Sequence, residues 1–150
     1  MTQIPHMLFY SYPQIVVQEV PDEISLALSM SGCNLACKGC HSTETWNPTF
    51  GKQLTVDVLQ TLIGTHKHIS CVLFYGGEWS PQELISLFTV CKLNQLKTCL
   101  YTGLELEQVP KSFLPHLDYL KVGPYVEALG GLASPTTNQR FILKKDFPKH

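Results

Sequence analysis

The chain has 150 residues, a length that folds as one domain and removes roughly 68–70% of the unfolded chain's surface from water. It is too short for a complete eight-stranded α/β barrel, which typically needs about 250 residues. Eleven basic and twelve acidic residues give a net charge of −1, so the composition offers no electrostatic case for binding duplex nucleic acid or an anionic membrane. We expect a single domain over residues 1–150.

We expect neither a membrane span nor a signal peptide in this sequence. No apolar run approaches the roughly 18–20 residues of a membrane span. No Lys or Arg precedes Lys38, so the charged start of a signal peptide is missing. We therefore expect a cytoplasmic protein.

The first elements in chain order are two extended segments and a helix. Residues 14–20 and 24–32 carry alternating or continuous apolar side chains, and Pro21 interrupts them at a turn. A long loop follows. Thr55 then has the character of a helix N-cap, and the apolar spacing after it predicts an amphipathic helix over 55–67.

The second half alternates between buried strands and helices. Short apolar runs predict strands at 71–77, 97–103, 118–123 and 139–144. Between the first two, Ser80 and Pro81 open a helix that ends at about Leu93. A weak helix, interrupted by two prolines, is expected around 105–115.

This alternation is typical of right-handed βαβ units and an α/β fold with a mostly parallel sheet. At about 30 residues per unit the chain accommodates roughly four such units. Sites in such sheets form beyond the carboxyl ends of the strands. Three polar or glycine-containing segments follow strands in this way, namely the loop after 24–32, the segment 76–78 and the segment 102–103. We expect them to converge.

Three of the six cysteines lie within the segment GCNLACKGCH, at Cys33, Cys37 and Cys40. A structural zinc site usually has four closed ligands, and His41, which directly follows Cys40, would strain a shared tetrahedron. A 4Fe–4S cluster also normally takes four cysteines. Three would leave one iron open, as in catalytic metal centres. The spacing therefore favours a 4Fe–4S cluster over zinc.

Together, the cysteine spacing and the GGE sequence at 76–78 resemble the radical S-adenosylmethionine superfamily. The segments SGCNLACKGCHSTETWNP, YTG at 101–103, YLKVGPYVEALGGL and SPTTNQR narrow this resemblance. They are similar to the activating proteins of anaerobic ribonucleoside-triphosphate reductase. The resemblance extends from about residue 14 to 143, and it departs from the family pattern at Trp79, where Pro or a small residue is more usual.

The resemblance implies a glycyl-radical activase, a radical S-adenosylmethionine oxidoreductase. Cys33, Cys37 and Cys40 would ligate three irons of the 4Fe–4S cluster, and the amino and carboxylate groups of S-adenosyl-L-methionine would bind the fourth. Reductive cleavage would give methionine and a 5′-deoxyadenosyl radical. That radical would abstract hydrogen from a glycine near the C-terminus of the reductase large subunit.

The resemblance also implies a fold and two partners. The fold would be a partial (βα) barrel of about four units, whose open side suits a protein loop better than an enclosed small molecule. The partners would be the anaerobic reductase and a flavodoxin-like electron donor.

Residues beside the last cysteine are expected near the cosubstrate. Gly39 and His41 flank Cys40 and should lie against the adenine. Many superfamily members have an aromatic residue at the position of Gly39, so His41 or a distant side chain would have to stack on the base. Trp46 could either pack the cluster loop or touch substrate.

Four residues at strand ends have candidate roles beside the methionyl group. Gly76 and Gly77 would let the methionyl ammonium approach the backbone, although a turn at the strand end would also require glycine. Glu78 could add negative charge at that ammonium or orient the loop. Lys121 could meet the methionyl carboxylate or the ribose, or it could be a solvated side chain at a strand end.

The remaining residues of interest have simpler expectations. Arg140, the only arginine, could bind a carboxylate or the partner's glycyl loop through its planar fork of donors, or it could hold the C-terminal loop. The other cysteines lie in apolar contexts and are expected to be buried free thiols: Cys71, Cys91 and Cys99. His66 and His68 are expected to cap a helix or to be solvated.

Two other functions compete with the activase. A radical enzyme of the 7-carboxy-7-deazaguanine synthase type has a similar short length and cysteine loop, but it would need additional elements to bind a small substrate. An electron-transfer or metal-binding module would be expected to have a fourth cysteine, and its function would not require the GGE sequence.

Overall fold

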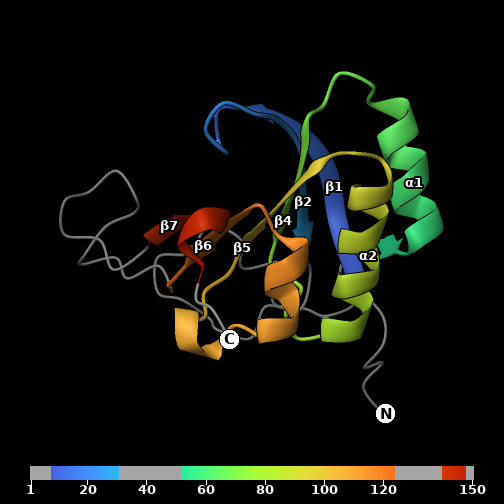
Figure 1. Ribbon diagram of the computed structural model, residues 1–150. Helices are drawn as coiled ribbons and strands as arrows, with labels where there is room; N and C mark the ends of the chain where they lie inside the picture. The colour runs from blue at the N-terminus through green and yellow to red at the C-terminus, as the bar shows by residue number, and fades with distance from the viewer. Residues whose placement is uncertain (1–7, 31–51, 124–139, 148–150) are drawn as a thin grey trace, which may run out of the picture.

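The computed structural model describes residues 8–30, 52–123 and 140–147, which form one mixed sheet with helices packed against it (Figure 1). The strands are β1 (Leu8–Val17), β2 (Ile24–Met30), β3 (Lys52–Leu54), β4 (Cys71–Tyr75), β5 (Lys97–Tyr101), β6 (Tyr119–Val122) and β7 (Arg140–Leu143). The α-helices are α1 (Val56–Thr65) and α2 (Pro81–Leu93). Short 3₁₀ helices span Leu106–Gln108, Lys111–His116 and Lys144–Asp146.

The sheet has the order β3-β1-β2-β4-β5-β6-β7. Its centre is parallel, because β2 pairs with β4, β4 with β5, and β5 with β6 in the same direction. Strands β1 and β7 run antiparallel to their neighbours. The α/β class and the parallel core are thus confirmed. Within the described residues the sheet is open between β3 and β7, and closure toward a partial barrel stays a prediction.

Most of the expected elements are present with shifted bounds. The N-cap of α1 is Thr55, whose hydroxyl accepts a hydrogen bond from the Val58 amide at 3.2 Å. Pro81 occupies the first turn of α2, as predicted. The turn expected at Pro21 is also present, and Asp22 there has a φ of 66°.

Two parts of the chain differ from the prediction. The first strand begins at Leu8 rather than at residue 14, and it tolerates Pro13 because the pairing with β2 shifts register between Tyr10 and Pro13. The weak helix expected around 105–115 is instead two 3₁₀ segments, with Pro110 at the N-cap of the second and Pro115 inside it. Proline lacks the amide proton that a longer α-helix would need at these positions.

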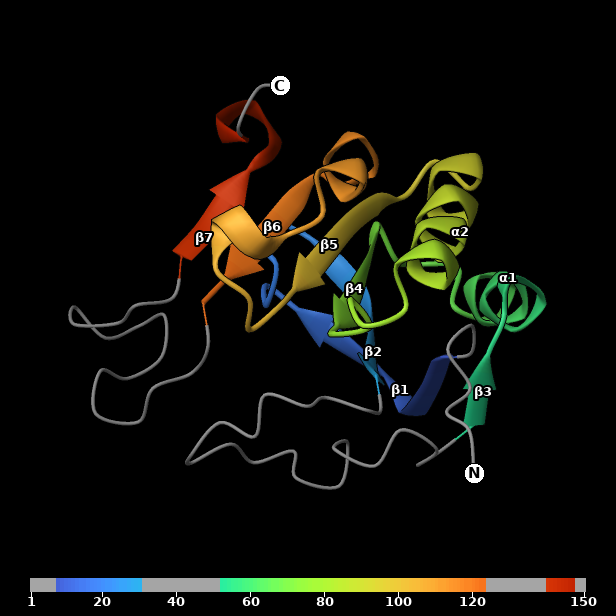
Figure 2. The same ribbon diagram turned by 90° about the horizontal axis from the view of Figure 1, so that it is seen from below.

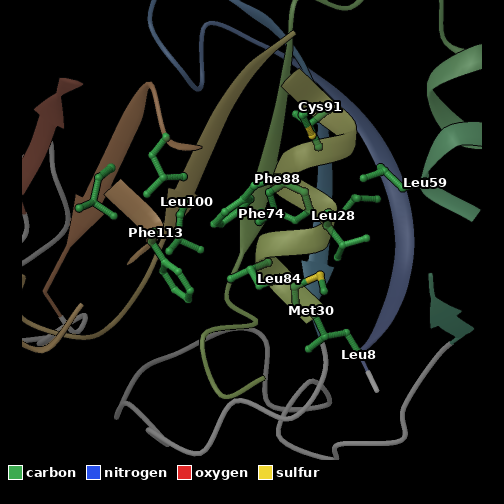
Figure 3. Packing of buried hydrophobic residues seen from close by; sticks show 14 of the residues in the cluster. Leu8, Leu28, Met30, Leu59, Phe74, Leu84, Phe88, Cys91, Leu100 and Phe113 are labelled. Carbon is green, nitrogen blue, oxygen red and sulfur yellow. The ribbon is translucent and has the colours of Figure 1, made fainter. Parts of the chain in front are cut away.

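Both α-helices and the 3₁₀ segments at Leu106–Gln108 and Lys111–His116 pack on one face of the sheet (Figure 2). Alternate residues of the central strands, such as Leu28, Phe74 and Leu100, meet the inner faces of α1 and α2 there. In this cluster Phe88 of α2 contacts Phe74 and Phe113 edge-on, with ring centroids 5.3 and 5.5 Å apart (Figure 3). The helical layer therefore shields one face and leaves the strand ends as the place for a site.

The opposite face of the sheet carries a smaller buried cluster of different character. Its buried members are Val20, Ala27, Cys71, Leu73, Cys99 and Tyr101, and partly buried aromatic side chains pack against them. Tyr101 contacts both Tyr75 and Phe141 edge-on, with ring centroids 5.5 and 6.2 Å apart. This face is the one that would line the interior of a partial barrel.

Candidate functional site

The carboxyl ends of the four central strands meet at one edge of the sheet. The parallel register aligns Ser29, Tyr75, Tyr101 and Lys121 across β2, β4, β5 and β6. Beyond this row, the Gly76 amide donates to the Tyr101 carbonyl at 2.9 Å. The segments 76–78 and 102–103 therefore lie side by side, as the sequence predicted.

The two glycines after β4 are required by their own backbone. Gly76 and Gly77 have φ values of 95° and 101°, a region that side chains with a β-carbon rarely adopt. A β-carbon on Gly76 would lie 2.9 Å from Cη2 of Trp79, and one on Gly77 would lie 3.3 Å from Cδ1 of Leu84. The turn and its packing thus account for both glycines without a ligand. The unusual Trp79 packs over the first of them.

Glu78 follows this turn and is half-buried. Its Oε1 accepts a hydrogen bond from the Thr102 hydroxyl at 2.7 Å. Burial raises the pKa of the Glu78 carboxyl, and the hydrogen bonds from Thr102 and from the backbone oppose that rise. A carboxylate held in this way at the end of β4 can receive a cationic ligand group.

Lys121 is half-buried on the face of the sheet opposite the helices. Its Nζ lies 4.6 Å from the centroid of the Tyr101 ring, within the range of a cation–π interaction. Burial lowers the pKa of Lys121, and the nearby Glu19 opposes that shift. Lys121 is therefore a partly desolvated cation rather than a freely solvated one.

The three motif cysteines lie outside the described residues. The other candidates in the same segment also lie outside the described residues. The placement of all six is therefore untested: Cys33, Cys37, Gly39, Cys40, His41 and Trp46. The segment begins directly after Met30, whose side chain lies against the glycine turn. A β-carbon on Gly77 would be 3.5 Å from Cγ of Met30, and Figure 3 shows Met30 beside Leu84 at this end of the core.

The other three cysteines are buried and free, as predicted: Cys71, Cys91 and Cys99. Burial raises the pKa of Cys71 and of Cys91 to about 12, and it raises that of Cys99 well above its ordinary value. Within residues 8–30, 52–123 and 140–147, no group of three or more His, Cys, Asp or Glu side chains could hold a metal ion.

The remaining predictions concern residues at the periphery. His66 caps α1, with its backbone amide donating to the Leu62 carbonyl at 3.1 Å, and His68 is exposed, so both expectations are confirmed. Arg140 is exposed at the start of β7 and pairs in register with Val122. It lies at the same edge of the sheet as the glycine turn, which leaves both of its proposed roles open.

Sequence reasoning assigned no role to Thr102, although the structure joins it directly to Glu78. Its sequence signals were its place at the end of an apolar strand, beside Gly103, and its membership of the YTG segment that resembles the activating proteins. A polar residue at the carboxyl end of a parallel strand is a general indicator of a site.

None of the helices that the structure describes has both the length and the apolar character to cross a lipid bilayer. This finding concerns the described residues alone.

Comparison with known proteins gives one family and several relatives. The family model described as "4Fe-4S single cluster domain" matches residues 24–141, a span that includes the three motif cysteines. The anaerobic ribonucleoside-triphosphate reductase-activating protein of Vibrio cholerae is 29% identical over 136 residues, covering 81% of this chain and 86% of that protein.

Two pyruvate formate-lyase-activating enzymes match a shorter region. The enzyme of Clostridium pasteurianum is 33% identical over 87 residues, which is 53% of this chain and 37% of that enzyme. The pyruvate formate-lyase 1-activating enzyme of Escherichia coli K12 is 35% identical over 79 residues, which is 48% of this chain and 32% of that enzyme. The match thus spans about a third of the length of these two relatives. The resemblance to activating proteins is confirmed.

Proposed function

Because this chain belongs to the family of 4Fe-4S single cluster domains, we propose that it is a glycyl-radical activase that uses one 4Fe–4S cluster and S-adenosyl-L-methionine. Its target is the large subunit of an anaerobic ribonucleoside-triphosphate reductase. The observation that carries the choice of target is the match to the Vibrio cholerae activating protein, which covers 81% of this chain and 86% of that protein.

The donor set of the chain fits such a cluster. Cys33, Cys37 and Cys40 would hold it and leave one iron for the cosubstrate. Cys33 comes three residues after Met30 in the sequence. Met30 in turn packs on the turn at Gly77. We therefore expect the cysteine motif to start close to the strand ends that carry the polar residues.

Two partly buried side chains of opposite charge suit the two charges of a methionyl group. Glu78 offers a carboxylate for the ammonium, and Lys121 offers an ammonium for the carboxylate. Partial burial strengthens both interactions, because charges attract more strongly where water is excluded.

Gly39 and His41 would lie against the adenine, and Gly76 and Gly77 would keep the backbone near the ammonium free of side chains.

When bound, the reduced cluster and S-adenosylmethionine supply the radical chemistry that removes a hydrogen atom from the partner's glycine. The chain itself binds and orients the cosubstrate and excludes water from it. The helical layer closes one face of the sheet, so the glycyl loop would approach from the opposite face within a partial barrel. Arg140, which is exposed at this edge, would contact that loop. A flavodoxin-like donor in the cytoplasm would provide the electron.

The test separates the chemistry from the target. The protein is reconstituted with iron and sulfide without oxygen, reduced and given S-adenosylmethionine, and 5′-deoxyadenosine is measured. The reductase large subunit is then added and the glycyl radical is followed by its EPR doublet, with pyruvate formate-lyase as the competing target. We expect 5′-deoxyadenosine and a doublet on the reductase. Absence of 5′-deoxyadenosine would overturn the activity, and a doublet on pyruvate formate-lyase alone would overturn the target.

A further inference from the structure

We propose that Thr102 is a positioning residue that fixes the carboxylate of Glu78 for the methionyl ammonium of S-adenosylmethionine. The inference rests on the proposed function, because that function gives Glu78 its ligand. It adds a residue that directly follows β5 to a site whose acidic group comes from the loop after β4.

The backbone holds Thr102 firmly. It is 5% exposed and directly follows β5, and its amide donates to the Lys121 carbonyl at 2.9 Å. On the other side, the Gly76 amide donates to the Tyr101 carbonyl at 2.9 Å. The sheet's hydrogen bonding thus continues past the strand ends and fixes Thr102 beside the turn that carries Glu78.

The hydroxyl of Thr102 can donate in only one direction. The Leu104 amide donates to Oγ1 of Thr102 at 3.1 Å, which uses an acceptor site of that oxygen. The single hydroxyl proton is then directed to Oε1 of Glu78, 2.7 Å away. This distance is that of a well-formed O–H···O hydrogen bond, and the bond opposes the rise that burial causes in the pKa of Glu78. Thr102 therefore both orients Glu78 and favours its charged form.

A shared role in the same interaction predicts non-additive effects. Thr102→Val keeps the shape of the side chain and removes the hydroxyl, whereas Thr102→Ser keeps the hydroxyl. Glu78→Gln removes the charge and leaves an oxygen that accepts the same hydrogen bond. If Thr102 acts through the Glu78 carboxylate, Thr102→Val should have little additional effect on cosubstrate affinity in the Glu78→Gln background.

The first measurement is the dissociation constant of S-adenosylmethionine for the cluster-loaded chain. We expect Thr102→Val to weaken binding about tenfold, in line with the loss of a hydrogen bond to a charged group. Thr102→Ser should bind almost as well as the native chain. An equal loss in the Val and Ser variants, or full additivity with Glu78→Gln, would overturn the proposal.

The second measurement needs neither cluster nor cosubstrate. In the chain without cluster, labelled with ¹³C at glutamate carboxyls, NMR follows the pKa of Glu78. We expect Thr102→Val to raise that pKa further and Thr102→Ser to leave it near the native value. Thr102→Ala replaces the Val variant if the latter does not fold. An unchanged titration would overturn the Thr102–Glu78 contact. A changed titration with unaltered binding in Glu78→Gln would instead overturn the proposed role of Glu78 at the cosubstrate.

Discussion

Leu84 of α2 lies against Gly77 at the end of β4, so that a β-carbon on this glycine would come within 3.3 Å of its Cδ1. Leu84 is fully buried and cannot move aside freely. The φ of Gly77 is 101°, which adds backbone strain to any substitution. Leu84 in α2 and the turn at Gly77 therefore restrict each other's position. This contact lies beside Met30, after which the cysteine segment begins in the sequence.

The first prediction concerns this turn. Gly77→Ala should lower the free energy of unfolding by about 1–3 kcal/mol, because the backbone conformation excludes a β-carbon. Gly64 in α1 is the matched control, since a β-carbon there would meet no atom within 4 Å. Gly64→Ala should raise the free energy of unfolding by roughly 0.5–1 kcal/mol through helix propensity. Urea denaturation of both variants checks the pair, and a loss of similar size in each would contradict the argument.

The second prediction concerns Asp118, which supports the opposite edge of the sheet. One of its oxygens, Oδ2, accepts the Thr98 amide at 2.9 Å and also pairs with Lys92. Asp118→Ala should cost about 1–3 kcal/mol, because it leaves a buried amide without its acceptor. Lys92→Met should cost about 1 kcal/mol or less, because the Lys92 side chain is 35% exposed and such pairs contribute little. Thermal and urea unfolding compare the two, and a larger loss in Lys92→Met would refute this ranking.

The third prediction is a pH dependence at Glu78. Burial raises the pKa of its carboxyl in the folded chain, so the folded state holds this proton more tightly than the unfolded state does. Its contribution to stability is therefore present below the ordinary value of 4.5 and is lost as the pH rises through the higher folded value. Glu78→Gln removes this titration. The variant should gain stability relative to the native chain between pH 4 and pH 7 in the absence of cluster, as urea denaturation can measure. A gain that shrinks with rising pH would contradict the stated direction.

The sequence predicted those features that local patterns encode. Short-range sequence patterns identified two strands and the start of one helix. These are the apolar runs of β4 and β5 and the Ser80-Pro81 start of α2. By contrast, β3 has only three residues, and it is a strand because it pairs with residues 8–10 of β1. Tertiary pairing of this kind leaves no periodic signal.

The candidate site also has parts that the sequence predicted and parts that only the structure shows. The order of the strands placed residues 76–78 and 102–103 at one edge, since carboxyl ends of parallel strands coincide. The hydrogen bond between Thr102 and Glu78 joins side chains 24 residues apart, and neither residue type specifies the other. Likewise, glycine at 76 and 77 was compatible with a ligand or with a turn. Only the φ values and the packing of Trp79 and Leu84 showed that the turn requires it.

The fourth prediction divides the cysteines by role. Cys37→Ala should abolish cluster assembly, whereas Cys91→Ala should assemble the cluster normally and lose only about 1 kcal/mol of stability from the core. The reason is that Cys91 lies fully buried on the inner face of α2, where burial raises the pKa of its thiol to about 12, so it does not readily supply the thiolate that metals bind.

Iron and sulfide content after anaerobic reconstitution, together with visible absorbance, measures this difference. Alkylation of the folded chain without cluster is an independent check. Cys91 should resist iodoacetamide until the chain is unfolded, because its side chain is fully buried. If Cys37→Ala and Cys91→Ala lose the cluster to the same extent while both remain folded, Cys91 would have to take part in holding it, and the assignment of the cluster to the single motif at 33–40 would be wrong.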